Sequence, residues 1–233
     1  GSTSRHESPR PRFGLANLTD FQSGDSGDYH VAVSNAVGTA TSDVVTLSVP
    51  PTITRLTDNV SVIEGDTLKL SVTAVGTPPI TYQWSKDGTV LEGETTPLFT
   101  LTEAEQSDAG IYAVEVNNAA GRAGSIEIMV TVLQPARIVT QPVGGTVVLG
   151  DAFSFEVVAS GTGPITYEWY HGGALVEEST GSTLQLTDLE SADSGEYHVV
   201  VSNERETDAG ETVAFGKETS NKATLTVMIP PSG

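Results

Sequence analysis

The sequence contains no cysteine, which excludes disulfide bonds, thiol nucleophiles and zinc sites built from cysteine. Basic residues are also scarce: 11 Lys and Arg stand against 30 Asp and Glu in 233 residues, a net charge of −19. Such a surface repels nucleic acid and anionic lipid, so we expect neither as a partner. No apolar run reaches the roughly 18 residues of a membrane span, and we expect no membrane insertion by this chain.

What the sequence does contain is a motif that occurs three times, around Tyr29, Tyr112 and Tyr197. Each copy has the form Asp-x-Gly-x-Tyr-x-Val-x-Val-x-Asn, which is typical of a turn that leads into a strand. The tyrosines are 83 and then 85 residues apart. A fixed period of this size predicts an array of similar modules.

A second shared block precedes the last two tyrosines and alternates between apolar and polar residues. Its apolar positions are Leu68, Leu70, Val72 and Ala74 in one copy and Phe153, Phe155, Val157 and Ala159 in the other. A period of two predicts a half-buried strand. Trp84 and Trp169 follow on further alternating runs, each 28 residues before its tyrosine. Many short strands between turn signals, with no helical period, predict an antiparallel β-sandwich.

The tryptophan on the third strand and the Asp-x-Gly-x-Tyr motif near the sixth resemble the immunoglobulin superfamily, closest to its I-type modules. The resemblance implies an all-β fold of tandem immunoglobulin-like sandwiches, two complete and one N-terminal and partial. It also implies that each tyrosine hydroxyl ties back to the backbone upstream, and that valines stand where such modules carry their disulfide cysteines. The expected core is Trp84, Tyr112, Val72, Val114, Trp169, Tyr197, Val157, Val199 and Tyr29.

Prolines at the joints and the motif period predict three modules, which we number 1 (residues 1–49), 2 (residues 50–133) and 3 (residues 134–233). Module 1 holds only the C-terminal strands, and a few strands with one apolar face cannot bury it alone. Something must therefore cover Leu18, Tyr29, Val31 and Val33. One hypothesis is self-association with the same segment of a second copy, as a swapped dimer. The alternative is an appendage docked on module 2.

Module 3 has a longer hairpin after Asn203 than the other modules, by roughly ten residues. Its acidic residues Glu204, Glu206, Asp208 and Glu211 are weak candidates for a Ca²⁺ site, although they lack the spacing of a calcium loop. The alternative is a solvated hairpin without a ligand. Tyr170 and Phe215 are the aromatic residues most able to reach solvent, and Glu168, Tyr170 and His198 are predicted to share one outer sheet face.

Enzyme motifs are absent from the sequence. It has no Gly-x-Ser-x-Gly elbow, no phosphate-binding loop that opens a helix and no His-Glu-x-x-His helix. His30 and His198 occupy equivalent outward positions and His171 lies at a hairpin turn, which fits solvated residues better than zinc ligands. We therefore expect no catalytic residues and no cofactor.

The function classes that remain are structural. The first is a non-catalytic extracellular array that acts as a spacer and adhesion module, with an unidentified protein or glycan ligand. The alternative is an accessory region of a secreted polysaccharide-active enzyme, and a cytosolic muscle-type scaffold is disfavoured by the acidity and the few lysines. Cysteine-free arrays rich in Thr, Val, Gly and Ala resemble those of large bacterial surface and secreted proteins, which implies an extracellular or cell-surface location.

Overall fold

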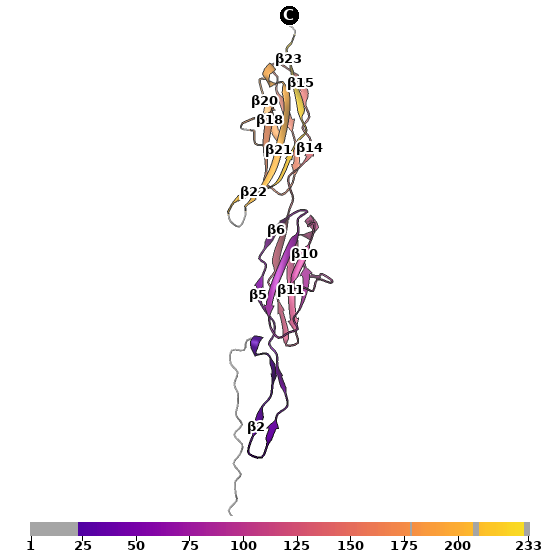
Figure 1. The fold of residues 1–233 in the computed structure, drawn as a ribbon. Helices are drawn as coiled ribbons and strands as arrows, with labels where there is room; N and C mark the ends of the chain where they lie inside the picture. The colour runs from indigo at the N-terminus through magenta and orange to yellow at the C-terminus, as the bar shows by residue number, and fades with distance from the viewer. Residues whose placement is uncertain (1–22, 178, 207–209, 231–233) are drawn as a thin grey trace, which may run out of the picture.

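The structure is a computed structural model that describes residues 23–177, 179–206 and 210–230. Two complete β-sandwiches, modules 2 and 3, follow a smaller set of N-terminal strands along an elongated chain (Figure 1). The predicted all-β fold class is confirmed; besides strands, the described residues hold short 3-10 helices at Ser23–Asp25, Gln106–Asp108 and Ser191–Asp193. Within these residues, no helix is long and apolar enough to cross a membrane.

Module 2 is built from two sheets. The first has the strand order β10-β7-β5, with β5 (Thr52–Leu56), β7 (Leu68–Val75) and β10 (Leu98–Leu101). The second has the order β6-β13-β11-β8-β9, with β6 (Val60–Ile63), β8 (Thr81–Lys86), β9 (Thr89–Val90), β11 (Gly110–Asn118) and β13 (Ile128–Leu133), while β12 (Gly121–Gly124) pairs with β11. The alternation predicted for β7 is confirmed, because Leu68, Leu70 and Val72 are buried and the residues between them are exposed.

Module 3 repeats this arrangement. One sheet has the order β15-β23-β21-β18-β19, with β15 (Gly145–Val148), β18 (Ile165–His171), β19 (Ala174–Leu175), β21 (Gly195–Glu206) and β23 (Ala223–Met228), and β22 (Thr212–Thr219) pairs with β21. The facing strands are β14 (Arg137–Thr140) with β17 (Val158–Ser160), and β16 (Phe153–Glu156) with β20 (Thr183–Leu186).

One feature of the sheets differs from the antiparallel expectation. β6 pairs parallel with β13, and β15 pairs parallel with β23. The reason is that the N-terminal segment of each module crosses between sheets: β5 pairs antiparallel with β7, and the chain then passes to the other sheet as β6. As a result, β6 and β15 are edge strands.

Each complete module encloses one apolar core around its tryptophan. Trp84 and Trp169 have no exposed surface, and each indole Nε1 donates to a backbone oxygen, that of Thr96 at 2.9 Å and that of Gly181 at 3.0 Å. The four valines at the cysteine positions are buried in these cores: Val72 and Val114 in module 2, Val157 and Val199 in module 3. Tyr112 and Tyr197 are buried, and their hydroxyls donate to Asp108 O at 3.0 Å and Asp193 O at 2.9 Å.

Module 1 forms two short strand pairs, β1 (Gly27–Tyr29) with β4 (Val45–Leu47) and β2 (Ala32–Ser34) with β3 (Thr39–Thr41). Tyr29 keeps the corner bond, since its hydroxyl donates to Asp25 O at 2.7 Å. Its assignment to a core was wrong: Tyr29 is 43% exposed and Val31 is 62% exposed. The two strand pairs described for module 1 leave this face exposed, and Leu18 lies outside the described residues.

Candidate functional site

The joint between modules 2 and 3 is a single peptide unit held from both sides. The carbonyl oxygen of Leu133 accepts the backbone N–H of Glu64 in module 2 at 2.9 Å. The N–H of Gln134, on the same peptide bond, donates to Oγ1 of Thr162 in module 3 at 2.7 Å. Because a peptide unit is planar, fixing both of its ends fixes the direction in which the chain leaves module 2 and enters module 3.

Asn203 makes further hydrogen bonds to this linker. Its Nδ2 donates to Gln134 O and to Thr162 O, both at 2.8 Å, and its Oδ1 accepts the N–H of Ala136 at 3.0 Å. The Gln134 oxygen also accepts the N–H of Thr162 at 2.9 Å. Asn203 has no exposed surface, so these bonds are made in a site without competing water. We call Thr162 and Asn203 the linker clamp of module 3.

Module 2 has an equivalent linker clamp, made by Thr77 and Asn118. The N–H of Val49 donates to Thr77 Oγ1 at 2.7 Å, and Val49 O accepts Asn118 Nδ2 at 2.7 Å and the N–H of Thr77 at 3.1 Å. Asn118 Nδ2 also reaches Thr77 O at 2.9 Å. The bonds of the threonine and of the asparagine Nδ2 to the linker are therefore made at both joints, whereas Asn118 Oδ1 accepts the N–H groups of Ala120 and Gly121 in its own turn.

Glycines let the linker lie against the clamp. A Cβ added at Gly161 would lie 2.9 Å from Ala136 Cα, and one added at Gly76 would lie 2.9 Å from Pro51 Cα. Both glycines also have positive φ, 143° and 158°. These glycines and the clamp residues were not among the sites predicted from the sequence. The available signal was a Gly-Thr pair at the same place in both modules, but nothing local indicates that it binds a linker.

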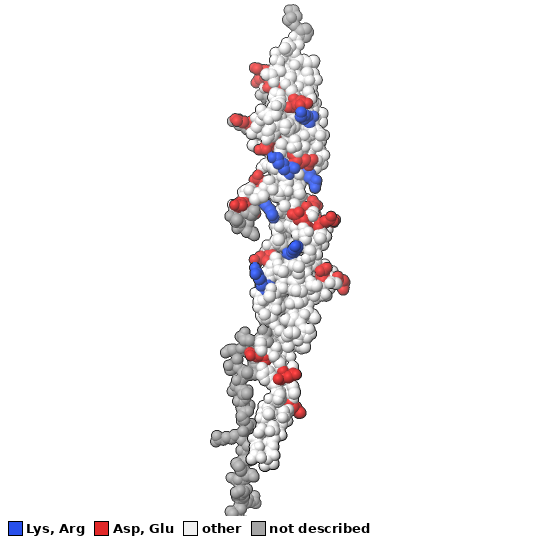
Figure 2. All heavy atoms as spheres, viewed as in Figure 1, with Lys and Arg blue, Asp and Glu red and all other residues white. Residues whose placement is uncertain are grey.

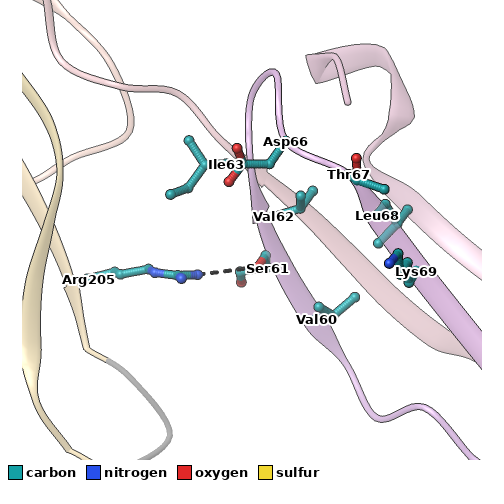
Figure 3. Close-up of a pocket in the computed structure, with 9 residues that line it drawn as sticks. All are labelled: Val60, Ser61, Val62, Ile63, Asp66, Thr67, Leu68, Lys69 and Arg205. Atoms are coloured by element: carbon teal, nitrogen blue, oxygen red, sulfur yellow. Dashed lines mark hydrogen bonds between the residues drawn. The ribbon is translucent and has the colours of Figure 1, made fainter. Parts of the chain in front are cut away.

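The long hairpin of module 3, formed by β21 and β22, adds a contact across the joint. Arg205 Nη1 donates to the backbone oxygen of Ser61, on the edge strand β6, at 3.3 Å (Figure 3). The side chain lies at a cleft of about 320 Å³ that is otherwise lined by module 2, by Val60–Ile63 and by residues 66–69.

The four acidic candidates for a Ca²⁺ site lie on this hairpin. Glu204 and Glu206 flank Arg205 on β21, Glu211 precedes β22, and Asp208 lies outside the described residues. Within the part of the chain that the structure describes, no group of three or more His, Asp or Glu side chains could hold a metal ion. Figure 2 shows acidic side chains spread over the modules, interspersed with basic ones on modules 2 and 3, as on a solvated surface.

The outer sheet face of module 3 carries the predicted polar cluster. The rings of Tyr170 and His198 stack at 5.0 Å with an angle of 6°, and the Tyr170 hydroxyl donates to Glu168 Oε2 at 3.3 Å. Burial, followed by the Glu168 carboxylate, raises the pKa of Tyr170. Phe215 and Tyr170 are half-buried.

The expectation that His171 is a solvated turn residue was wrong. Its ring is half-buried at the end of β18 and stacks on Tyr197 at 4.2 Å, because the register of β18 places it directly opposite that tyrosine on β21.

Comparison with known protein families gives one match in each complete module. The family model described as immunoglobulin domain matches residues 50–118 and 135–203. These two segments contain the tryptophans, the tyrosine corners and both linker clamps.

The similar proteins are much longer than this chain, and the names of two of them mention a basement membrane and a muscle M-line. Human hemicentin-1 is 30% identical over 96% of this chain, and the mouse basement membrane-specific heparan sulfate proteoglycan core protein is 30% identical over 82%. A muscle M-line assembly protein of Caenorhabditis elegans is 31% identical over 80%. The chain spans 4%, 6% and 3% of their lengths.

Similar solved structures are also tandem modules. An I-band fragment of titin has a TM-score of 0.65 at 22% identity and covers 91% of this chain and 77% of that one. The three N-terminal domains of an outer capsid protein of bacteriophage RB49 have a TM-score of 0.56 at 20% identity, covering 91% and 82%. At these identities the likeness concerns the fold alone.

Proposed function

The chain belongs to the immunoglobulin domain family, and from this premise we propose that it is a non-catalytic structural array whose modules act as a stiff, extended spacer outside the cell. Folds of this kind host many functions, so a function follows from a site rather than from the fold. The site is the joint, because the properties of a spacer are decided where one module meets the next.

The observation that carries the proposal is the Leu133–Gln134 peptide, bonded to Glu64 in module 2 and to Thr162 in module 3. No residue between the two modules is left free to rotate, since Leu133 is the last residue of β13 and Gln134 is already held by the clamp. A linker in which every residue is bonded to a module fixes the orientation of one module relative to the next. A flexible linker has several residues that are bonded to neither module.

The extracellular location is supported by the names of the relatives. Hemicentin-1 and a basement membrane proteoglycan core protein share about the same identity with this chain as a muscle M-line protein does. The acidic, lysine-poor composition favours the extracellular group over the muscle protein. Bacterial origin, and a protein or glycan ligand for the array, stay predictions. An antibody against module 3 that labels intact cells would support the location, and labelling only after permeabilisation would contradict it.

Self-association through module 1 is part of the same proposal. Tyr29, Val31 and Val33 form an exposed apolar face on short strands, and a face of this kind is stabilised by a second apolar sheet. Sedimentation at increasing protein concentration tests the idea. A dimer that dissociates when Val31 and Val33 are both replaced by Lys would support it, and a monomer at all concentrations would contradict it.

The spacer is tested by distance measurements between spin labels. The chain has no cysteine, so cysteines introduced at Thr100 and Gln185 label equivalent exposed positions in modules 2 and 3. We expect one narrow distance distribution, and a broader one for Thr162→Ala. The matched control is Thr166→Ala, which removes a hydroxyl bonded within module 3 to Ser202 O. A broad distribution in the unmodified chain would contradict the proposal.

A further inference from the structure

The hairpin of module 3 extends well past its own linker clamp. Twelve residues separate the paired residues Asn203 and Gly216, whereas two separate the equivalent pair Asn118 and Gly121 in module 2. The ladder between β21 and β22 continues to the pair Glu206 and Thr212. At about 3.3 Å per residue, the three residues after Asn203 carry the strand about 10 Å further. In Figure 1 the hairpin projects from module 3 toward module 2.

Arg205, in this extension, contacts module 2. Successive residues of a strand point to opposite faces, so Arg205 points away from the face that carries Glu204 and Glu206. Its Nη1 meets Ser61 O on the outward edge of β6, whose other edge is paired with β13. The contact binds a backbone oxygen of an edge strand that has no neighbouring strand on this side.

The joint between modules 1 and 2 lacks an equivalent of this contact within the described residues. The hairpin of module 2 ends directly after Asn118, and the position equivalent to Arg205 is Ala120, in the turn. The arginine of that hairpin, Arg122, folds back onto Glu115 of its own module at 3.1 Å. Both joints therefore have a linker clamp, and the second has an additional contact away from the chain axis.

We propose that the hairpin of module 3 is a latch on module 2: Arg205, bound to the edge of β6, sets the angle between modules 2 and 3 and restricts bending at this joint. The inference rests on the proposed spacer function. The clamp holds the linker peptide at the joint itself, and a second contact to one side restricts the bending that would carry the hairpin away from β6. The contact is one hydrogen bond of 3.3 Å beside an open cleft, so it can open without unfolding either module.

The experiment compares spin-label distances in three variants, with labels at Thr100 and Gln185. Arg205→Ala removes the donor, and a chain in which residues 204–215 are replaced by Ala-Ala shortens the hairpin to the length found in module 2. We expect both to increase the fraction of molecules outside the main distance peak about five-fold. Arg122→Ala, which removes an arginine bound within module 2, is the matched control and leaves the distribution unchanged.

The possible results distinguish a failure of the latch proposal from a failure of the spacer proposal. A narrow peak in the unmodified chain that stays narrow in Arg205→Ala overturns the latch and leaves the spacer intact, whereas a broad distribution in the unmodified chain contradicts the spacer itself. Broadening by the short hairpin but not by Arg205→Ala also overturns the latch, because the guanidinium would then have no part in it. Hydrogen exchange at β6 gives a second readout, with faster exchange expected in Arg205→Ala and in the short hairpin.

Discussion

Glu64 and Thr162 lie in different modules, yet they bind the two ends of one peptide bond, Leu133–Gln134. The backbone N–H of Glu64 holds its oxygen, and the side-chain hydroxyl of Thr162 holds its nitrogen. These two bonds fix the orientation of module 3 relative to module 2. A single substitution at the joint should therefore change that orientation.

Asn203→Ala should destabilise module 3 by about 2–3 kcal/mol, because it leaves the buried N–H of Ala136 without its acceptor and the half-buried Gln134 and Thr162 oxygens without their amide donor. Urea denaturation followed by Trp169 fluorescence measures the loss. Asn221→Ala is the control, since the side chain of Asn221 is exposed, and it should change the free energy of unfolding by less than about 0.5 kcal/mol. Equal effects of the two substitutions would show that the clamp contributes nothing to stability.

Gly161→Ala should destabilise module 3 by more than about 1 kcal/mol, because the new Cβ would meet the linker at Ala136 and the backbone has positive φ. Gly181→Ala serves as control: the nearest atoms to its added Cβ are 3.8 Å away. Thermal melting of both variants checks the expectation. A silent Gly161→Ala would mean that the linker can move away from the clamp without cost.

Trp169→Ala should cost about 3–5 kcal/mol, because it removes a fully buried side chain and leaves a cavity beside Phe155. Tyr197→Phe should cost about 1–2 kcal/mol, the value of its bond to Asp193 O. Leu175→Ala, at a side chain that is 50% exposed, is the control for both. If all three variants melt alike, the assignment of Trp169 and Tyr197 to the core is wrong.

Val199→Thr and Val31→Thr make the same chemical change at equivalent positions of the repeat. Val199 has no exposed surface, so the buried hydroxyl should cost about 1–3 kcal/mol. Val31 is 62% exposed in the single chain, so at protein concentrations too low for self-association its substitution should change stability by less than about 0.5 kcal/mol. Denaturation curves of both variants test this. A large loss for Val31→Thr would indicate that the face of module 1 is covered in solution.

Alkaline pH should destabilise modules 2 and 3 through their tyrosine corners. Burial, followed by the carboxylate of Asp108, raises the pKa of Tyr112 to about 12, and burial, followed by Asp193, raises the pKa of Tyr197 to about 12. An unfolded tyrosine ionises near pH 10, so the folded state holds these protons more tightly. The contribution to stability is complete below about pH 10 and is lost as the pH rises to about 12.

The double variant Tyr112→Phe and Tyr197→Phe is the control for this pH effect. It cannot ionise at the corners, so its urea midpoint should fall less than that of the unmodified chain when the pH is raised from about 10 to about 12. Parallel losses in the two proteins would show that other groups cause the alkaline unfolding.

The sandwich fold was predictable because its signals are local. The alternation at Leu68, Leu70 and Val72 decides which side of β7 is buried, whatever strand packs against it. The corner bond is local too, since Tyr29 makes it with Asp25 although this tyrosine is not enclosed in a core. Burial is not local: Tyr29 and Tyr197 share a motif, but one is 43% exposed and the other 1%.

The joint was not predictable, because its hydrogen bonds connect residues that are far apart in the sequence. Asn118 and Asn203 stood out as the last residues of the repeat, but their partners Val49 and Gln134 lie 69 residues earlier in the chain. The position of the inserted hairpin was predicted correctly. Its acidic residues suggested a metal site, but the hairpin contacts module 2 across the joint through Arg205.

The module type, the repeat and the two complete cores follow from the sequence alone, because alternation, turn residues and a fixed period act within a strand or between neighbouring strands. How the modules are joined follows from the three-dimensional structure. Hydrogen bonds such as those of Glu64 and Thr162 to one peptide unit depend on where distant segments meet, and a pattern of residue types along the chain does not specify a partner across that distance.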